Sequence, residues 1–360
     1  MMSMPKFTPK FTTVPHSFHT ELKSRITAYF EEVGKATTGD YNLFLKAVIL
    51  MLSTAVVYIH LVFFTPGVIW ALLECALMGC LVAAIGFNVM HDGAHGSFSK
   101  YKWLNHFAAF SLNILGGNSF MWNMKHNVIH HAYTNVDGVD DDIDIQPWMR
   151  MSATQKKYKL HKYQHLYFWF LYSLLYIFWI FVLDYAKYFR REVGGMPLKK
   201  MTLGDHFVFW GFKIFHAFLF VGLPIYMVGF ASWVIGFVTF TCVAGFVLSI
   251  VFQLAHTVEH TAFPVPNAET GKLDDEWAVH QIKTTANFAT HNKIVSWLVG
   301  GLNFQIEHHL FPKISHVHYP AISKIIRQAC QEYGIVYIEY PRVRYAVASH
   351  VAFLREMGRK

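Results

Sequence analysis

The chain has 360 residues, of which 54% are hydrophobic, 17% aromatic and 15% charged, whereas soluble domains usually carry about 25% charged residues. This composition excludes an ordinary soluble globular protein and indicates one integral membrane domain with polar parts outside the bilayer. The formal net charge of +8 suits contact with anionic lipid or with an acidic redox partner, and no nucleic-acid-binding motif accompanies it.

Residues 1–42 are polar and lack the short apolar core of a signal peptide, so they predict a cytoplasmic N-terminal segment. Beyond them, the sequence predicts an all-α membrane domain over residues 43–325 and a cytoplasmic C-terminal segment over residues 326–360. Four stretches approach the ~20 mainly apolar residues that a membrane span needs, and we expect them to form two helical hairpins; they are residues 43–65, 68–90, 207–228 and 232–254.

Three histidine clusters lie beside these apolar stretches, and we call them boxes one, two and three. Their residues are His91 and His95; His126, His130 and His131; and Gln305, His308 and His309. Residues three or four apart share a helix face, so each box predicts a set of side chains that converge on a metal. His256 follows the last span and adds a predicted ligand. His260 and Gln305 remain open between direct ligands and supporting residues.

The number of imidazoles predicts two metal ions. Imidazole suits Zn, Cu, Fe and Ni, but these boxes exceed what one ion can bind. The His-Glu-x-x-His signature of zinc proteases is absent, as is the Glu-x-x-His pattern of soluble di-iron bundles. An all-histidine di-iron site held by a cytoplasmic cap is therefore the preferred interpretation.

The acidic residues near the boxes allow two interpretations of their role. Asp92, Glu259 and Glu307 are candidates to orient imidazole N–H groups, with solvated or lipid-facing carboxylates as the alternative. The run from Asp137 to Asp144 reads most simply as a solvated loop, or else as a partner of His130 or His131 or of a substrate headgroup. Most isolated histidines, His350 among them, are interpreted as ordinary surface or interface residues, and His316 and His291 are the least certain of these.

The positions of the boxes and of the basic residues predict which side of the membrane each segment lies on. If all boxes build one site, an even number of membrane crossings must separate them along the chain. The weaker stretch 104–121 lies between boxes one and two, so it should not cross. Three long stretches lie between boxes two and three, and of these the aromatic stretch 166–183 is expected to lie flat at the interface. The outer turns, residues 66–67 and 229–231, contain no Lys or Arg. The positive-inside rule then places the boxes and both termini in the cytoplasm, at the inner membrane of a bacterium or the endoplasmic reticulum of a eukaryote.

The motifs resemble those of the membrane fatty acid desaturase family over about residues 40–325. The resemblance rests on His-Asp-Gly-Ala-His at 91–95, Lys-His-Asn-Val-Ile-His-His at 125–131 and Gly-Gly-Leu-Asn-Phe-Gln-Ile-Glu-His-His-Leu-Phe-Pro at 300–312. Box three has Gln305 where many members of the family have His, and in this it resembles the front-end branch, which includes delta-6, delta-5 and linoleoyl-CoA desaturases. The resemblance implies two irons that use O2 to introduce a cis double bond into an acyl-CoA or acyl-lipid chain. It implies ligands at His91, His95, His126, His130, His131, His256, His308 and His309.

One departure concerns the electron donor. Many front-end enzymes carry a fused haem domain with a His-Pro-Gly-Gly motif, which does not occur here, so a separate ferredoxin or b-type cytochrome is implied. Weak substrate-contact candidates are Trp122, Tyr133 and Trp148, for which membrane packing is the alternative. A related di-iron hydroxylase is the nearest rival function. A histidine-rich metal transporter or receptor is disfavoured because the four spans contain few polar residues apart from His60 and Glu74.

Overall fold

A computed structural model describes residues 8–360. The fold is mostly helical, and five helical segments are long and apolar enough to cross a membrane by length and composition; they are Tyr41–Phe64, Val68–His95, Lys159–Arg190, Leu203–Val228 and Phe230–His256. This confirms the predicted helical membrane class. The four predicted spans all lie within these segments, with ends shifted by a few residues, and the predicted interfacial stretch lies within the remaining one.

The elements are numbered in chain order. The helices are α1 Phe18–Val33, α2 Tyr41–Ile59, α3 Val68–Ile85, α4 His91–His95, α5 Lys102–Ile114, α6 Ser119–Asn123, α7 His131–Tyr133, α8 Gln164–Phe178, α9 Asp184–Arg190, α10 Leu203–Ala217, α11 Leu223–Val228, α12 Phe230–His256, α13 Trp277–Lys283, α14 Lys293–Leu298, α15 Gln305–Leu310, α16 Tyr319–Glu332 and α17 Val343–Arg359. Two-residue strands form three pairs: β1 Lys10–Phe11 with β4 Lys272–Leu273, β2 Glu192–Val193 with β3 Met196–Pro197, and β5 Asn287–Phe288 with β6 Glu339–Tyr340.

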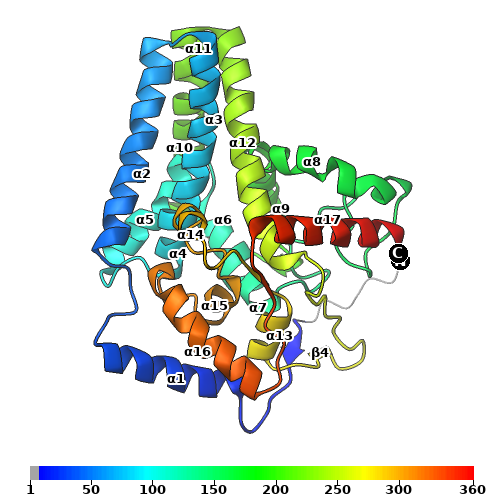
Figure 1. Ribbon diagram of the computed structural model, residues 1–360. Coiled ribbons are helices and arrows are strands. Elements are labelled where there is room, and N and C mark those ends of the chain that lie inside the picture. Colours follow the sequence, from blue (N-terminus) through cyan, green and yellow to red (C-terminus); the bar gives the residue numbers. More distant parts are fainter. Residues whose placement is uncertain (1–7) are drawn as a thin grey trace.

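Two hairpins form an elongated bundle (Figure 1). Asp40 begins the first one, where its side chain accepts a hydrogen bond from the Leu43 N–H at 3.0 Å, a stabilising N-cap. Gly229 joins α11 to α12 with a φ of 82°, which favours glycine. The box-bearing ends of α3–α4 and α12 lie together at the end opposite these turns, as the hairpin prediction requires.

Helix α8 runs across the bundle rather than along it (Figure 1). It crosses α12 at Gly245, where an added Cβ would lie 2.4 Å from the Ser173 carbonyl oxygen. The weaker stretch 104–121 is divided by a turn at Gly116 and Gly117 between α5 and α6. At 13 residues, α5 is shorter than the ~20 residues of a span.

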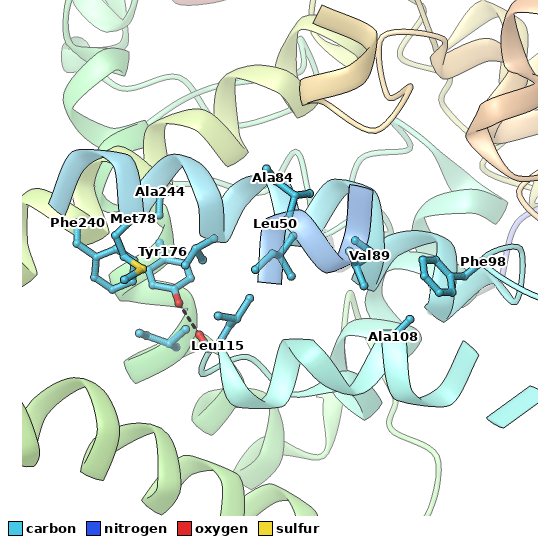
Figure 2. Close-up of a cluster of buried hydrophobic side chains, with 14 of the residues drawn as sticks. Leu50, Met78, Ala84, Val89, Phe98, Ala108, Leu115, Tyr176, Phe240 and Ala244 are labelled. Carbon is cyan, nitrogen blue, oxygen red and sulfur yellow. Dashed lines mark hydrogen bonds between the residues drawn. The ribbon is translucent and has the colours of Figure 1, made fainter. Parts of the chain in front are cut away.

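The two hairpins meet at a close contact between α3 and α12. A Cβ added to Gly79 would lie 2.6 Å from the Phe240 carbonyl oxygen and 2.9 Å from the Ala244 amide nitrogen. Around this contact, Met78, Phe240 and Ala244 belong to a buried apolar cluster (Figure 2), in which the Tyr176 hydroxyl donates to the Leu115 carbonyl. Small residues allow such close approach of membrane helices.

Replacing Gly79 by alanine is therefore expected to destabilise the bundle by about 1–3 kcal/mol, because the added Cβ clashes with backbone that cannot rotate away. Fluorescence-detected thermal denaturation of the detergent-solubilised protein would measure it. Gly211→Ala is the matched control, since no atom lies within 4 Å of the Cβ it would add. Equal melting temperatures for the two variants would contradict the close packing.

Helices α1 and α17 belong to the cap that covers the bundle. Helix α1 buries Phe18, Leu22 and Ile26 in a cluster with residues of α13, α15 and α16. Helix α17 buries Phe353 and Leu354 in a second cluster with Phe168 and Tyr172 of α8 and with other residues. The predicted domain boundaries at 42/43 and 325/326 fall inside α2 and α16.

Candidate metal centre

Four pieces of chain bring the box histidines together. Box one lies in α4, directly after a π-helical turn at Gly86–Met90. Box two begins in a π-helical turn, Met124–His130, and ends in α7. His256 is the last residue of α12, and box three occupies α15. Single π-helical turns occur frequently at functional sites, and here they set the direction of two boxes.

The ligand nitrogens fall into overlapping groups. We call His91, His95, His126 and His308 the first histidine group, and His130, His256 and His309 the second histidine group. Within each group, one nitrogen per residue lies within 4.8 Å of the others. His131 lies between the two and forms a further set with His308 and His309. Box two is thus shared, with His126 on one side and His130 on the other.

The inward-facing nitrogens have the distances of metal ligands. The Nε2 atom of His126 lies 3.2 Å from Nε2 of His91 and 3.2 Å from Nε2 of His131. Two nitrogens bound to one ion at about 2.1 Å lie about 3.0–3.4 Å apart. Several buried atoms also lack a hydrogen-bond partner among residues 8–360; in this cluster they are His95 Nε2, His130 Nε2, His131 Nδ1, Gln305 Oε1, His308 Nε2 and His309 Nε2. Such unpaired atoms are costly unless an ion binds them.

Burial keeps most of these rings neutral. It lowers the pKa of His126, His131, His308 and His309 well below 6.5, and the neighbouring imidazoles lower it further. Burial would also lower the pKa of His130, but the carboxylates of Asp140 and Asp142 outweigh it and raise that pKa. Neutral imidazole is the form that binds metal, so the cluster suits a metal site.

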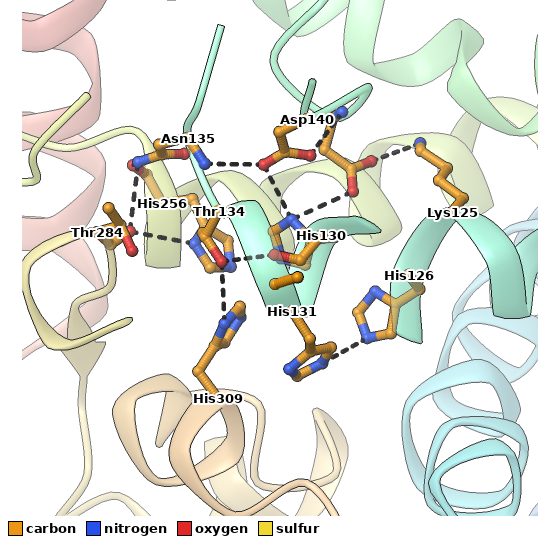
Figure 3. A network of polar contacts seen from close by, with 12 residues as sticks. Lys125, His126, His130, His131, Thr134, Asn135, Asp140, His256, Thr284 and His309 are labelled. Carbon is orange, nitrogen blue, oxygen red and sulfur yellow. Dashed lines mark hydrogen bonds and ion pairs between the residues drawn. The ribbon is translucent and has the colours of Figure 1, made fainter. Parts of the chain in front are cut away.

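The outward-facing nitrogens are held by specific partners (Figure 3). His130 Nδ1 donates to the Asp140 carboxylate at 3.0 Å, and His309 Nδ1 donates to Gln281 Oε1 at 2.8 Å. His308 Nδ1 lies 3.1 Å from the Tyr319 hydroxyl, and His256 Nδ1 lies 3.3 Å from the Thr284 carbonyl oxygen. Each contact leaves Nε2 facing the cluster, which is the usual arrangement of metal-bound histidine.

The acidic run after box two is therefore not simply a solvated loop. Asp140 is buried and accepts both the His130 ring N–H and the Asn135 backbone N–H, the latter at 2.9 Å. Asp142 pairs with Lys125 at 2.5 Å, and Asp141 pairs with Lys187 of α9 at 3.0 Å. These pairs fold the run back over the second histidine group.

The three carboxylates expected to orient box histidines do not hydrogen-bond them among the described residues. Asp92 accepts from Ser315 at 2.8 Å and from His316 Nδ1 at 3.0 Å, while its closest approach to His91 Nδ1, 4.0 Å, is too long for a hydrogen bond. Glu307 accepts from Asn287 and Tyr337, each at 2.7 Å. Glu259 is exposed. Asp92 and Glu307 thus bind residues outside the boxes.

Gln305 and His260, which the sequence left open, differ in position. Gln305 is buried, and its Nε2 lies 3.0 Å from His256 Nε2. Because the amide oxygen and nitrogen are interchangeable by rotation of the amide, Gln305 can present its oxygen beside His256. His260 is exposed, with a φ of 76°, and it lies outside every histidine group.

Only one of the three aromatic candidates touches the cluster. Trp122 stacks on His126 with ring centroids 4.4 Å apart. Tyr133 instead stacks on Phe11 of β1, at 5.8 Å, and Trp148 is exposed.

Five isolated histidines interpreted as ordinary or left uncertain are buried in the structure: His161, His216, His280, His316 and His350. Sequence reasoning also missed Gln281 and Tyr319 as partners of His309 and His308. Neither residue lies one helical turn from its histidine along the chain. Gln281 is 28 residues from His309, and Tyr319 is 11 residues from His308.

The variant Gln281→Leu is expected to weaken metal binding about 10- to 100-fold, the usual effect of losing a residue that orients a metal-bound histidine. The leucine would remove the 2.8 Å acceptor of the buried His309 Nδ1–H and leave it only the longer contact with the Thr134 hydroxyl, at 3.3 Å. Chelator titration of the purified protein would measure the change. Gln328→Leu on α16 changes an exposed glutamine and should have no effect; equal affinities for both variants would contradict the orienting contact.

Comparison with known proteins adds independent information. A model of the family described as fatty acid desaturase matches residues 67–341. The chain is 36% identical over 344 residues to the sn-1 linoleoyl-lipid 6-desaturase of Arthrospira platensis, covering 95% of this chain and 92% of that protein. It is 35% identical to the sn-1 linoleoyl-lipid 6-desaturase of Synechocystis sp., covering 98% of each. The acyl-lipid (8-3)-desaturase of Physcomitrium patens is 34% identical, over 95% of this chain and 72% of that protein.

Proposed function

The chain belongs to the fatty acid desaturase family, and on that premise we propose that it is a front-end, delta-6-type desaturase acting on acyl chains of membrane lipids. Two relatives matched over nearly their full length are linoleoyl-lipid 6-desaturases, which favours a lipid-linked substrate over a CoA ester. The observation that carries the proposal is the convergence of eight box and span-end histidines, with Gln305 beside His256.

Two iron ions fit the residues present. The first ion would be held by His91, His95, His126 and His308, and the second by the second histidine group with Gln305. His131 lies close enough to serve either group. When bound, the irons supply O2 activation and removal of hydrogen from an unactivated acyl chain.

The balanced reaction defines what the protein must supply. An acyl CH2–CH2 pair, O2, two electrons and two protons become a cis CH=CH pair and two waters. We propose a separate ferredoxin or b-type cytochrome as the source of the two external electrons. The buried cluster excludes bulk water, and Trp122, which stacks on His126, is placed to border the acyl chain there.

The proposed topology has four crossings with the metal centre and both termini in the cytoplasm. The outer turns at residues 66–67 and 229–231 carry no Lys or Arg, which fits the positive-inside rule. The transverse direction of α8 (Figure 1) supports an interfacial position for it. The site then faces the compartment that contains the electron donor.

Expression in cells that contain linoleoyl lipids and a competent electron donor tests this function. Mass spectrometry of the extracted lipids should show a new cis double bond between the carboxyl end of the linoleoyl chain and its existing double bonds. Labelled linoleate presented as lipid or as CoA ester would separate the two substrate forms. A hydroxylated chain would identify the rival hydroxylase, and unchanged lipids in the presence of the donor would contradict desaturation.

A further inference from the structure

The turn that follows His256 is held from outside the histidine boxes. Helix α12 ends at His256, and residues 257–260 turn away from it. The His256 carbonyl accepts the Asn135 side-chain N–H at 2.8 Å. The position of the His256 ring therefore depends on what fixes this backbone on its far side.

His350 of α17 provides that support. Its Nδ1 donates to the Thr257 carbonyl at 2.6 Å, and its Nε2 accepts from the Tyr172 hydroxyl of α8 at 2.9 Å. Burial lowers the pKa of His350 to about 4, so the ring is neutral and carries one proton. These partners fix that proton on Nδ1.

The residue before His350 holds the same turn. The Ser349 hydroxyl accepts the Glu259 backbone N–H at 2.9 Å. The Tyr340 hydroxyl of β6 donates to the Glu259 carbonyl at 2.7 Å and lies 2.8 Å from the Ser349 hydroxyl. Both backbone groups of Glu259 are thus bound by the C-terminal part of the chain.

Helix α17 is itself anchored firmly enough to act as a support. Gln164 donates to the Leu354 carbonyl and Arg150 donates to the Met357 carbonyl, each at 2.8 Å. Phe353 stacks on Phe263 with ring centroids 5.1 Å apart. Helix α17 lies beyond residue 341, where the match to the desaturase family model ends.

We propose that His350 is a positioning residue, which holds the Thr257 turn so that His256 can complete the second histidine group. This inference rests on the proposed function in one respect, namely that the second group binds a metal. His350 does not touch the ion site. It acts through Thr257, the residue directly after His256.

The test compares bound iron in purified full-length variants. His350→Leu removes both hydrogen bonds, and His350→Asn keeps an amide N–H for the Thr257 carbonyl. Arg355→Leu is the control, because it changes an exposed residue of the same helix and leaves its anchoring contacts in place. We expect about two irons per chain in the unmodified protein, His350→Asn and Arg355→Leu, and about one in His350→Leu, because only the second histidine group loses its support.

Two irons in a folded His350→Leu protein would overturn the inference, and so would equal iron loss in Arg355→Leu. If His350→Leu does not fold, Tyr172→Phe decides, since it removes only the hydroxyl that fixes the His350 ring. It should lose one of its irons to a chelator severalfold faster than the unmodified protein, and an equal rate would again overturn the inference. An unmodified protein without iron would contradict the proposed function instead.

Discussion

Replacing His308 by alanine is expected to abolish desaturation, with a loss beyond the ~10- to 100-fold that follows removal of a mere orienting partner. His308 belongs to the first histidine group and also to the set with His131 and His309. Its Nε2 is buried without a partner among residues 8–360, while its Nδ1 faces the Tyr319 hydroxyl. The ring thus offers the proposed metal ion a nitrogen that alanine cannot supply. Product formation in cells and iron content after purification measure the two losses.

His291→Ala is the matched control for His308→Ala. His291 is exposed and lies outside every histidine group, so this variant should keep both activity and iron. A His308→Ala protein that retains activity would show that box three does not hold the metal.

The second large effect is expected for Asp140→Asn, which should lower metal affinity about 10- to 100-fold. The buried carboxylate accepts the His130 ring N–H and the Asn135 backbone N–H with the same oxygen. Asparagine keeps the shape but removes the charge that raises the pKa of His130 and strengthens its bond to the ring. Competition against a chelator of known affinity would measure the loss.

Asp144→Asn controls for the general effect of removing charge from this acidic run, because Asp144 is exposed. Only the Asp140 variant should weaken metal binding. Similar affinities in the two variants would mean that the run acts through its overall charge rather than through one hydrogen bond.

Periodic and repeated features made much of the fold predictable. Apolar runs of span length and the turns at Pro66–Gly67 and Gly229 predicted both hairpins. The aromatic stretch 166–183 predicted that α8 differs in direction from the other long apolar helices, because tyrosine and tryptophan favour the membrane interface. The cap was not predicted in detail, since its short helices and two-residue strands are stabilised by contacts between distant segments.

The candidate site shows the same division between local and distant information. Spacing identified the box histidines, because i, i+3 and i+4 positions are visible along the chain. Helical spacing put His126 and His130 on one face and turned His131 toward a second ion, whereas in the structure His126 belongs to the first histidine group and His130 to the second. The π-helical turn changes the direction of successive side chains there. Gln281, Tyr319 and His350 act from other elements, and their roles appear only once the chain is folded.

The iron content of the purified, unmodified protein tests the central claim most directly. Two histidine groups that share one buried cluster predict about two iron ions per chain, measured by inductively coupled plasma mass spectrometry against protein concentration from amino-acid analysis. A single ion per chain, or zinc in place of iron in a preparation that desaturates lipids, would contradict a di-iron centre.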